Sequence, residues 1–448
     1  MKKTENLMGT KPIFSLLMTM AIPPMISMLI QSMYNIIDSI YVAQLGEKAL
    51  SAVSLIFPLQ NLTNAVAVGF GVGVNACVAM SLGAKDDEKV NSTATHGIVL
   101  SIIHSIIFII IGILLTKPFL NMFTNDKEVL KLGQQYGSIV ICFSFGFLIY
   151  LVIEKLFQSV GNMSIPMILT ILGAVINIIL DPIFIFGKFG VPAMGIKGAA
   201  IATVIGQMAS FIVGVILFRK RNIGIKIDFI NFKFNKDIIL KLYGIGIPSS
   251  LMMAMPSLLI SILNGILVQV SQVSVAVLGI YYKLQNFVYM PANGVVQGMR
   301  PIISYNYGAN NKKRVNDTLK ISLTVVMSIM ALGTVLLLFI PKEILHLFNA
   351  TEDMMSIGVK ALRIISLGFI ISSINIVYSG AFEALGNGKE SLIISSLRQL
   401  IILVPSSVIL LKLINVNGVW VSFPISEAIC AIISILLIKK HLKSSIFK

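Results

Sequence analysis

The sequence predicts an all-α integral membrane protein in which twelve transmembrane helices form two pseudo-symmetric bundles of six. Three observations lead to this fold class. Of the 448 residues, 56% are hydrophobic and only 12% are charged, whereas soluble proteins carry roughly 25% charged residues. Apolar runs of about 20 residues, long enough to cross a bilayer core of about 30 Å, recur along the chain. The second half of the sequence also repeats the first.

Turn residues and charges divide the chain into twelve predicted spans. Several exceed about 25 residues, so we expect them to tilt, bend or extend beyond the bilayer. The longest polar connection follows the sixth span. This connection is predicted to be a cytoplasmic linker (residues 221–237). It joins an N-terminal bundle (residues 1–220) to a C-terminal bundle (residues 238–448). The predicted spans are 13–43, 50–81, 94–116, 132–158, 164–187, 195–218, 238–269, 275–305, 316–340, 356–383, 391–413 and 417–438.

The two halves match at one constant offset in the numbering, which carries Gly73 onto Gly298 and which we call the repeat offset. Because each half holds six predicted helices, the second copy keeps the orientation of the first. This is a parallel repeat related by an axis along the membrane normal. The matched residues include Leu59-Gln60-Asn61 with Leu284-Gln285-Asn286, Gly69 and Gly73 with Gly294 and Gly298, and Gly161-Asn162 with Gly386-Asn387.

The basic residues lie mainly in short segments between the apolar runs, so the net charge of +16 indicates membrane topology rather than nucleic-acid binding. When both termini and the even-numbered loops are assigned to one side, that side receives 21 basic residues and the other receives 9. The richer side is expected to be cytoplasmic, which places both termini inside the cell. No cleavable signal peptide is evident, and the three cysteines lack metal-ligand spacing.

An acid and an amide interrupt the apolar stretch GAVINIILDPIFIFG, residues 173–187. Asn177 and Asp181 are spaced i, i+4 and therefore share one helix face. A carboxylate in hydrocarbon costs at least about 2.5–3.5 kcal/mol, and desolvation favours its neutral form. Pro182 has no N–H, so we expect it to free a backbone carbonyl and bend the helix. Together these groups predict a site for a proton or a small cation.

A second acid, Asp38, lies late in the first span, after Pro23 and Pro24, which we expect to bend that helix. Thr203 in the sixth span would add a hydroxyl to the site if the helices pack together. Either acid could instead cap a helix end at the bilayer surface, so this alternative stays open. Further polar residues of the first half are expected near a cavity: Gln31, Tyr34, Glu154, Gln158 and Gln207.

The two halves differ at the acids. The repeat offset carries Asp38 onto Leu263, and the second half aligns Val404 with Asp181. We therefore expect cation coupling to reside in the first half.

The chain resembles the multidrug and toxic compound extrusion (MATE) family, and most closely its bacterial MepA-like branch. The stretches IPPMISMLIQSMYNIIDSIYVAQLG and GNMSIPMILTILGAVINIILDPIFIFG carry the resemblance. It implies a V-shaped pair of bundles in a bacterial cytoplasmic membrane. It also implies export of lipophilic, often cationic drugs by proton or sodium antiport. We expect the transporter to be a monomer and to need no other cofactor.

The resemblance further implies a cation-coupling set of Asp38, Asp181 and Asn177, with Thr203 as a looser match. Sodium, if it is the coupling ion, would bind at Asp38, Asn177 and Asp181. Acids that other family members carry in the seventh and tenth helices are missing here, except Glu383 at the end of the tenth span.

Two other functions are compatible with parts of the sequence. A lipid-linked oligosaccharide flippase of the same superfamily would share the bundle plan, but it should carry intramembrane arginine and lysine for a pyrophosphate. An intramembrane prenyl- or acyltransferase would need an Asp-rich or metal-binding motif, or a His/Asp pair. No such constellation surrounds the four histidines, so we expect a transporter and not an enzyme.

Overall fold

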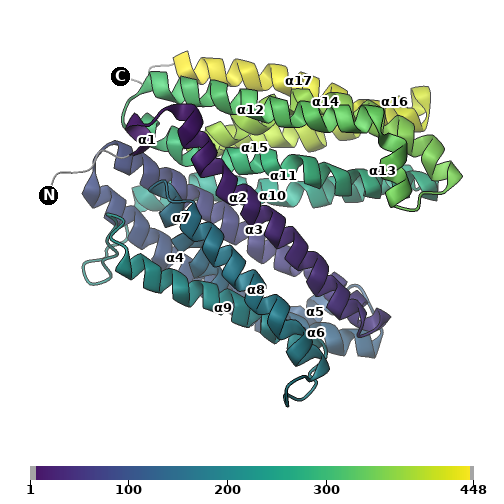
Figure 1. Cartoon of the computed structure of the whole chain (residues 1–448), viewed down its shortest axis with the longest axis horizontal. Helices are drawn as coiled ribbons and strands as arrows, with labels where there is room; N and C mark the ends of the chain where they lie inside the picture. Colours follow the sequence, from purple (N-terminus) through teal and green to yellow (C-terminus); the bar gives the residue numbers. More distant parts are fainter. Residues whose placement is uncertain (1–6, 444–448) are drawn as a thin grey trace. The chain divides into compact units, whose positions relative to one another are not determined.

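The computed structural model describes residues 7–443, and this part of the chain consists of helices joined by turns and short connections (Figure 1). The helices are α1 (Leu7–Thr10), α2 (Ile13–Ala43), α3 (Glu47–Gly83), α4 (Asp87–Leu114), α5 (Thr116–Asn121), α6 (Lys127–Cys142), α7 (Phe145–Ser159), α8 (Ser164–Phe186), α9 (Ile196–Lys220), α10 (Lys236–Leu267), α11 (Gln272–Gly308), α12 (Lys312–Phe339), α13 (Pro341–Leu347), α14 (Glu352–Ala384), α15 (Gly388–Ser396), the π-helical segment η1 (Leu397–Ile402), α16 (Leu403–Ile414) and α17 (Val416–Lys443).

All twelve predicted spans are helical in the structure. The fourth is divided into α6 and α7, which are bent by 41° at their junction. The eleventh consists of α15, η1 and α16. Three short helices, α1, α5 and α13, were not predicted, because such short segments give no helical period in the sequence.

Ten described helices are long and apolar enough to cross a membrane, and the bent pair of α6 and α7 raises this number to eleven. The remaining predicted span is α11, which has 37 residues but includes polar side chains such as Lys283, Gln285 and Asn286. The predicted fold class, an all-α multi-pass membrane protein, is confirmed.

The internal duplication is visible in the helix boundaries. α3 and α11 both have 37 residues, and α4 and α12 both have 28. The repeat offset carries the start of α3 at Glu47 onto that of α11 at Gln272. It also carries the start of α4 at Asp87 onto that of α12 at Lys312. The repeat seen in the sequence is therefore a repeat of helices of equal length.

The chain divides into two compact units whose boundaries lie inside helices. One unit contains the described residues up to Met25 together with those from Leu251 onward, and the other contains Ile26–Ser250. The repeat offset carries Met25 onto Ser250, so the two boundaries fall at equivalent places, and the first follows Pro23-Pro24. Each unit therefore contains the opening segment of the other half's first helix: the unit of residues 26–250 holds the start of α10, and the other unit holds the start of α2.

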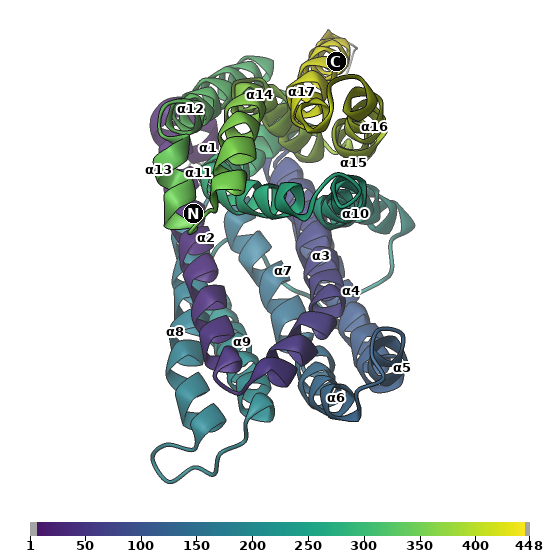
Figure 2. The same cartoon turned by 90° about the vertical axis from the view of Figure 1, so that its right-hand side faces the viewer.

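Within each unit, long helices pack along one another. In the unit of residues 26–250, α8 packs against α9, and α3 packs against α4 and α7 (Figure 2). Its core is formed by side chains such as Phe70, Val74, Leu151 and Leu156. In the other unit, α14 lies between α12 and α17 (Figure 2).

Repeated glycines allow helices to approach closely inside each unit. A Cβ atom at Gly298 of α11 would lie 2.8 Å from the backbone oxygen of Met20, and one at Gly73 of α3 would lie 2.5 Å from that of Leu242. Small residues at such contacts let two helix backbones pack against each other in a membrane. This explains why Gly73 and Gly298 occur at the same place in both repeats.

Replacing Gly298 with alanine should destabilise the protein, because the new methyl group would clash with the backbone of α2. We expect a loss of about 1–3 kcal/mol and a lower apparent melting temperature in detergent. Gly279→Ala, in the same helix, is the control, since no atom lies within 4 Å of a Cβ atom at Gly279. Equal melting temperatures for Gly298→Ala and the parent protein would contradict this packing.

Candidate functional site

Two helices bring three polar side chains together in the unit of residues 26–250. Asn177 and Asp181 of α8 and Thr203 of α9 are 2%, 0% and 5% exposed. The helices can approach because each carries a glycine at the contact. A Cβ atom at Gly206 of α9 would lie 2.6 Å from the backbone oxygen of Gly173 of α8. This close packing, one turn before Asn177, places Asn177 against Thr203.

The Asn177 amide connects the other two side chains. In the orientation that satisfies both of its polar atoms, its nitrogen donates to Asp181 Oδ2 at 2.9 Å, and its oxygen accepts from Thr203 Oγ1 at 3.3 Å. The amide therefore supplies one donor to the buried carboxyl group. The i, i+4 spacing read from the sequence corresponds to this contact.

Asp38 of α2 completes the group. Its carboxyl group lies close enough to that of Asp181 for the two groups to interact. Tyr34, one turn earlier on the same helix, reaches the hydroxyl of Thr203. One carboxyl oxygen of Asp38, Oδ1, is buried and has no hydrogen-bond partner among residues 7–443. We refer to Asp38, Asn177, Asp181 and Thr203 as the acid cluster.

The acid cluster requires a positive charge or a proton. Ionised carboxyl groups only accept hydrogen bonds, so Asp38 and Asp181 attract each other only when one is protonated or a cation binds between them. In the described part of the chain, no group of three or more His, Cys, Asp or Glu side chains has the arrangement of a metal site. The donor set of two carboxyl groups, an amide and a hydroxyl suits a proton or a hard monovalent cation.

Sequence reasoning missed two residues beside the acid cluster. Tyr136 of α6 is 3% exposed and lies close enough to Asp38 and Asp181 to interact electrostatically with them. Gln60 of α3 donates to its hydroxyl at 3.4 Å. In the sequence, Gln60 was noted only as part of the repeated Leu-Gln-Asn triplet. The signal that could have found Tyr136 is the amphipathic pattern of α6, which places Tyr136 on the buried face of that helix.

The predicted cavity residues take different positions. Gln207 lies one turn after Thr203, and its Oε1 is buried without a hydrogen-bond partner among the described residues. Gln31 lies two turns before Asp38 and is exposed. Glu154 and Gln158 belong instead to a network with Lys155 of the same helix. Lys155 Nζ donates to Glu154 Oε1 at 3.1 Å and to Gln158 Oε1 at 3.0 Å.

The prolines do not interrupt their helices. α2 is continuous through Pro23 and Pro24, and α8 is continuous through Pro182. The bent pair in the described chain is α6 and α7, where the junction at Phe143 and Ser144 contains no proline.

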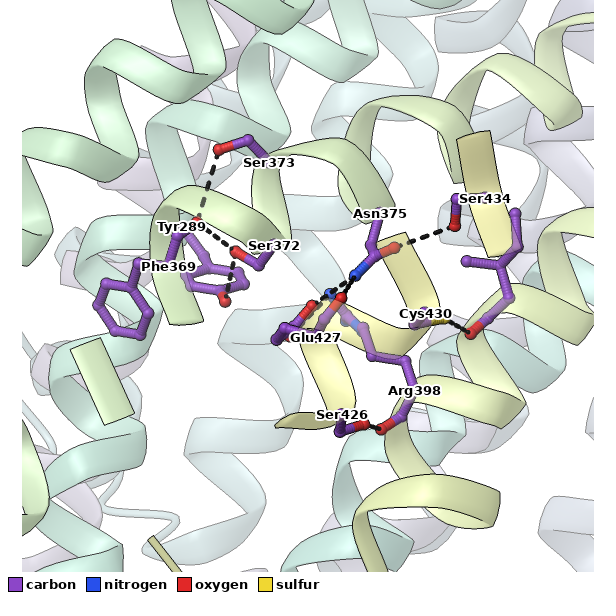
Figure 3. Close-up of polar contacts among 11 residues, drawn as sticks. Tyr289, Phe369, Ser372, Ser373, Asn375, Arg398, Ser426, Glu427, Cys430 and Ser434 are labelled. Carbon is purple, nitrogen blue, oxygen red and sulfur yellow. Dashed lines mark hydrogen bonds and ion pairs between the residues drawn. The ribbon is translucent and has the colours of Figure 1, made fainter. Parts of the chain in front are cut away.

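The other unit contains a polar network of a different kind (Figure 3). Glu427 of α17 accepts from Asn375 Nδ2 of α14 at 2.7 Å and lies 3.6 Å from Arg398 Nη1 of η1. Ser434 donates to Asn375 Oδ1 at 3.0 Å, and Ser426 donates to the backbone oxygen of Arg398 at 2.5 Å. The sequence offered no role for Glu427, because its partners belong to other helices, far from it along the chain.

The two units thus differ in how they neutralise membrane-embedded acids. Three carboxylates in the candidate spans have basic partners, namely Glu154 with Lys155, Glu383 with Arg300, and Glu427 with Arg398. Among the described residues, no basic side chain lies within 4.0 Å of Asp38 or Asp181. Asp38 and Asp181 are therefore buried membrane acids that have each other, and no basic side chain of the described residues, as a charged neighbour.

A duplicated bundle of apolar helices with buried acids is the architecture of a secondary transporter. The MatE family model matches residues 23–183 and 248–409, once in each repeat. The chain therefore belongs to the MatE family, and the resemblance inferred from the sequence is confirmed.

Curated relatives match nearly the whole chain. The multidrug export protein MepA of Staphylococcus aureus strain MSSA476 is 26% identical over 428 residues, which cover 95% of this chain and 94% of the relative. The MepA protein of Staphylococcus haemolyticus strain JCSC1435 is 26% identical over 427 residues, covering 95% and 93%. The chain is thus MepA-like along its length.

Solved structures share the fold. A MOP superfamily transporter from Pyrococcus furiosus superposes with a TM-score of 0.91 at 24% identity, covering 100% of both chains. A MATE transporter crystallised in complex with MaL6 gives a TM-score of 0.91 at 24% identity, covering 99% of both chains. The twelve-span arrangement of this chain is therefore that of known MATE transporters.

Breaking the Lys155 network should destabilise the N-terminal repeat. Lys155→Met would leave the Glu154 carboxylate buried without its cation, and we expect a loss of about 3 kcal/mol or more. Lys155→Met combined with Glu154→Gln removes both charges and should recover most of this loss. Thermal unfolding of the purified variants in detergent measures both effects. A single variant as stable as the parent protein would show that the pair has no structural role.

Proposed function

We propose that the chain is an ion-coupled multidrug exporter in which the acid cluster binds the coupling ion. The observation that carries this proposal is the contact between Asp38 and Asp181 without a basic partner among the described residues. Such a pair gains most from a proton or Na⁺ that arrives from outside the protein. The MatE family assignment and the name multidrug export protein of the MepA relatives support drugs as the exported compounds.

The mechanism follows from the charge of the acid cluster. An outward-open form releases a lipophilic or cationic drug when a proton or Na⁺ binds at Asp38 and Asp181 and removes negative charge there. Movement of α2 beyond Pro23-Pro24, where the boundary between the two compact units falls, then returns the transporter inward. Release of the ion to the cytoplasm restores the negative cluster, which favours binding of the next cationic drug.

The driving force is sufficient for concentrative export. One elementary charge moving through 100 mV supplies about 2.3 kcal/mol. Because about 1.4 kcal/mol corresponds to a factor of ten, one proton exchanged for one uncharged drug molecule could sustain a drug gradient of roughly fifty-fold. No other cofactor is needed in this scheme.

The setting of the transporter completes the proposal. The chain lies in a bacterial cytoplasmic membrane with both termini in the cytoplasm, supported by the excess of basic residues in the even-numbered loops. The sequence halves 1–220 and 238–448, joined by residues 221–237, are the repeated bundles. The transporter works as a monomer, with membrane lipid and small molecules as its partners and no nucleic acid.

The flippase alternative has less support. A pyrophosphate-bearing lipid would need basic side chains that are open to it. Three basic residues of the candidate spans, Lys155, Arg300 and Arg398, already lie against Glu154, Glu383 and Glu427. The enzyme alternative also has less support, because the curated relatives are named multidrug export proteins.

Removing either acid should abolish concentrative efflux. Asp38→Asn and Asp181→Asn keep the shape of the side chain but cannot exchange a proton or hold Na⁺ with a full charge. Ethidium efflux from cells at matched expression measures the loss. Asp237→Asn, at the exposed start of α10, is the control and should pump normally. Undiminished pumping by both acid variants would remove the coupling role from the acid cluster.

The coupling ion can be identified in liposomes. With the purified chain reconstituted, we expect drug transport to follow an imposed pH gradient, an imposed sodium gradient, or both. The combined variant Asp38→Asn/Asp181→Asn should respond to neither. Transport by the parent protein that ignores both gradients would contradict ion-coupled antiport.

A further inference from the structure

Two hollows at equivalent places in the repeats differ in their charge. One hollow, of about 510 Å³, is lined by residues that include Ile13, Asn311, Lys313, Arg314, Asp317 and Lys320. We call it the Lys313 hollow. The other, of about 310 Å³, is lined by residues that include Asp86, Glu88, Lys89, Ser92, Ile238 and Lys241. We call it the Glu88 hollow. Each lies within a single compact unit.

The hollows correspond residue by residue at the repeat offset. The corresponding pairs are Ile238 with Ile13, Asp86 with Asn311, Glu88 with Lys313, Lys89 with Arg314 and Ser92 with Asp317. A concave site that survives in both copies is a property of the duplicated scaffold. It forms where the start of the third long helix of each repeat, α4 or α12, meets the start of a first helix, α10 or α2.

The charge of the two sites has diverged. The Lys313 hollow contains three basic side chains and one acidic side chain. The Glu88 hollow contains two basic side chains (Lys89 and Lys241) and three acidic ones (Asp86, Glu88 and Asp237). At the position of Glu88 the second repeat has Lys313, so the sign of the charge is reversed there.

The helix starts reinforce this difference. Asn311 caps α12 by accepting from the Arg314 backbone N–H at 3.1 Å, and Asp86 caps α4 in the same way through Lys89 at 3.0 Å. The first turn of a helix carries a partial positive charge. The neutral cap of α12 leaves this charge in place, whereas Asp86, Asp87 and Glu88 offset it at α4.

Arg314 is held by the chain itself. Its Nη2 donates to the backbone oxygens of Met8 and Lys11 at 3.0 and 2.8 Å, and its Nε donates to Asn306 Oδ1 at 3.2 Å. Lys313 and Lys320 are exposed, and neither lies within 4.0 Å of a carboxylate among the described residues. These two lysines are therefore available to a ligand, while Arg314 shapes the wall of the Lys313 hollow.

We propose that the Lys313 hollow binds the headgroup of an anionic phospholipid and that the Glu88 hollow does not. The hollow lies where α2 and α12 pass from polar ends to apolar spans, which is the depth of lipid headgroups. A phosphodiester suits Lys313, Lys320 and the start of α12. Ile13 and Ile321 give the same hollow an apolar side for the glycerol and the first methylenes of the lipid.

The test uses the repeat as its own control. The binding of short-chain phosphatidylglycerol to the purified full chain in neutral detergent is measured by microscale thermophoresis. Lys313→Gln/Lys320→Gln should weaken binding roughly 25-fold, since each lysine near a membrane surface contributes about a factor of five. Lys89→Gln/Lys241→Gln removes the same charge from the Glu88 hollow and should leave the affinity unchanged.

Two further ligands distinguish a lipid from its parts. Phosphatidylcholine of the same chain length carries no net charge, and inorganic phosphate has no glycerol or acyl chain. Both should bind at least about ten times more weakly than phosphatidylglycerol. Phosphatidylcholine lacks the net negative charge that the lysines attract, and phosphate lacks the apolar part that would contact Ile13 and Ile321. Phosphate binding as tightly as the lipid would overturn the assignment of a lipid site.

Equal weakening by the two double variants would show a general effect of net charge, and no weakening by either would show that the lipid binds elsewhere. Both results overturn the proposal. Both variants must keep the melting temperature of the parent protein. If Lys313→Gln/Lys320→Gln does not fold, the single variant Lys313→Gln should still weaken binding about fivefold.

Discussion

A carboxylate inside an apolar helix bundle keeps its charge only when a cation or several hydrogen-bond donors lie against it. This chain meets that constraint in two ways. Glu427 lies beside Arg398, and Glu154 lies beside Lys155, so these acids carry a permanent counterion. Asp181 has a single amide donor from Asn177 and a second acid, Asp38, as its neighbours. We propose that the charge that balances this pair comes from solution, and the proposed transport cycle depends on that difference.

The features that the two repeats share belong to the helical scaffold, and the features in which they differ are the buried acids of the proposed ion site. Helix lengths, close-packing glycines, the hollows at the helix starts and the boundaries of the compact units all recur at the repeat offset. The membrane-embedded acids do not recur. The offset carries Thr203 onto Ala428, next to Glu427, so both repeats have polar groups where the last helix meets the fifth span. At this contact the second repeat pairs Glu427 with Arg398. The first repeat has Asp181 there, beside Asp38 of α2, and no basic residue lies within 4.0 Å of either acid in the described part of the chain.

Much of this arrangement follows from the sequence, because hydropathy and the repeat are local or periodic signals. The spans were predicted in number and place, and the spacing of Asn177 and Asp181 gave their shared helix face. The pairing of Glu154 with Lys155 could not be predicted, since neighbouring residues on a helix point about 100° apart and only the long lysine side chain closes the distance. Tyr136 and the exchange of the first helical segments between units depend on contacts far apart in the chain, which no periodic pattern reports.

The central claim is that the acid cluster takes its counterion from solution and gives it up when drug binds. The most direct measurement is the amount of proton or sodium released per molecule of purified protein when a transported drug is added. We predict release by the parent protein and no release by Asp38→Asn/Asp181→Asn. Arg398→Met/Glu427→Gln should release the ion like the parent protein, because Glu427 has Arg398 as its counterion and takes none from solution. Equal release from the variant without the two acids would contradict the account.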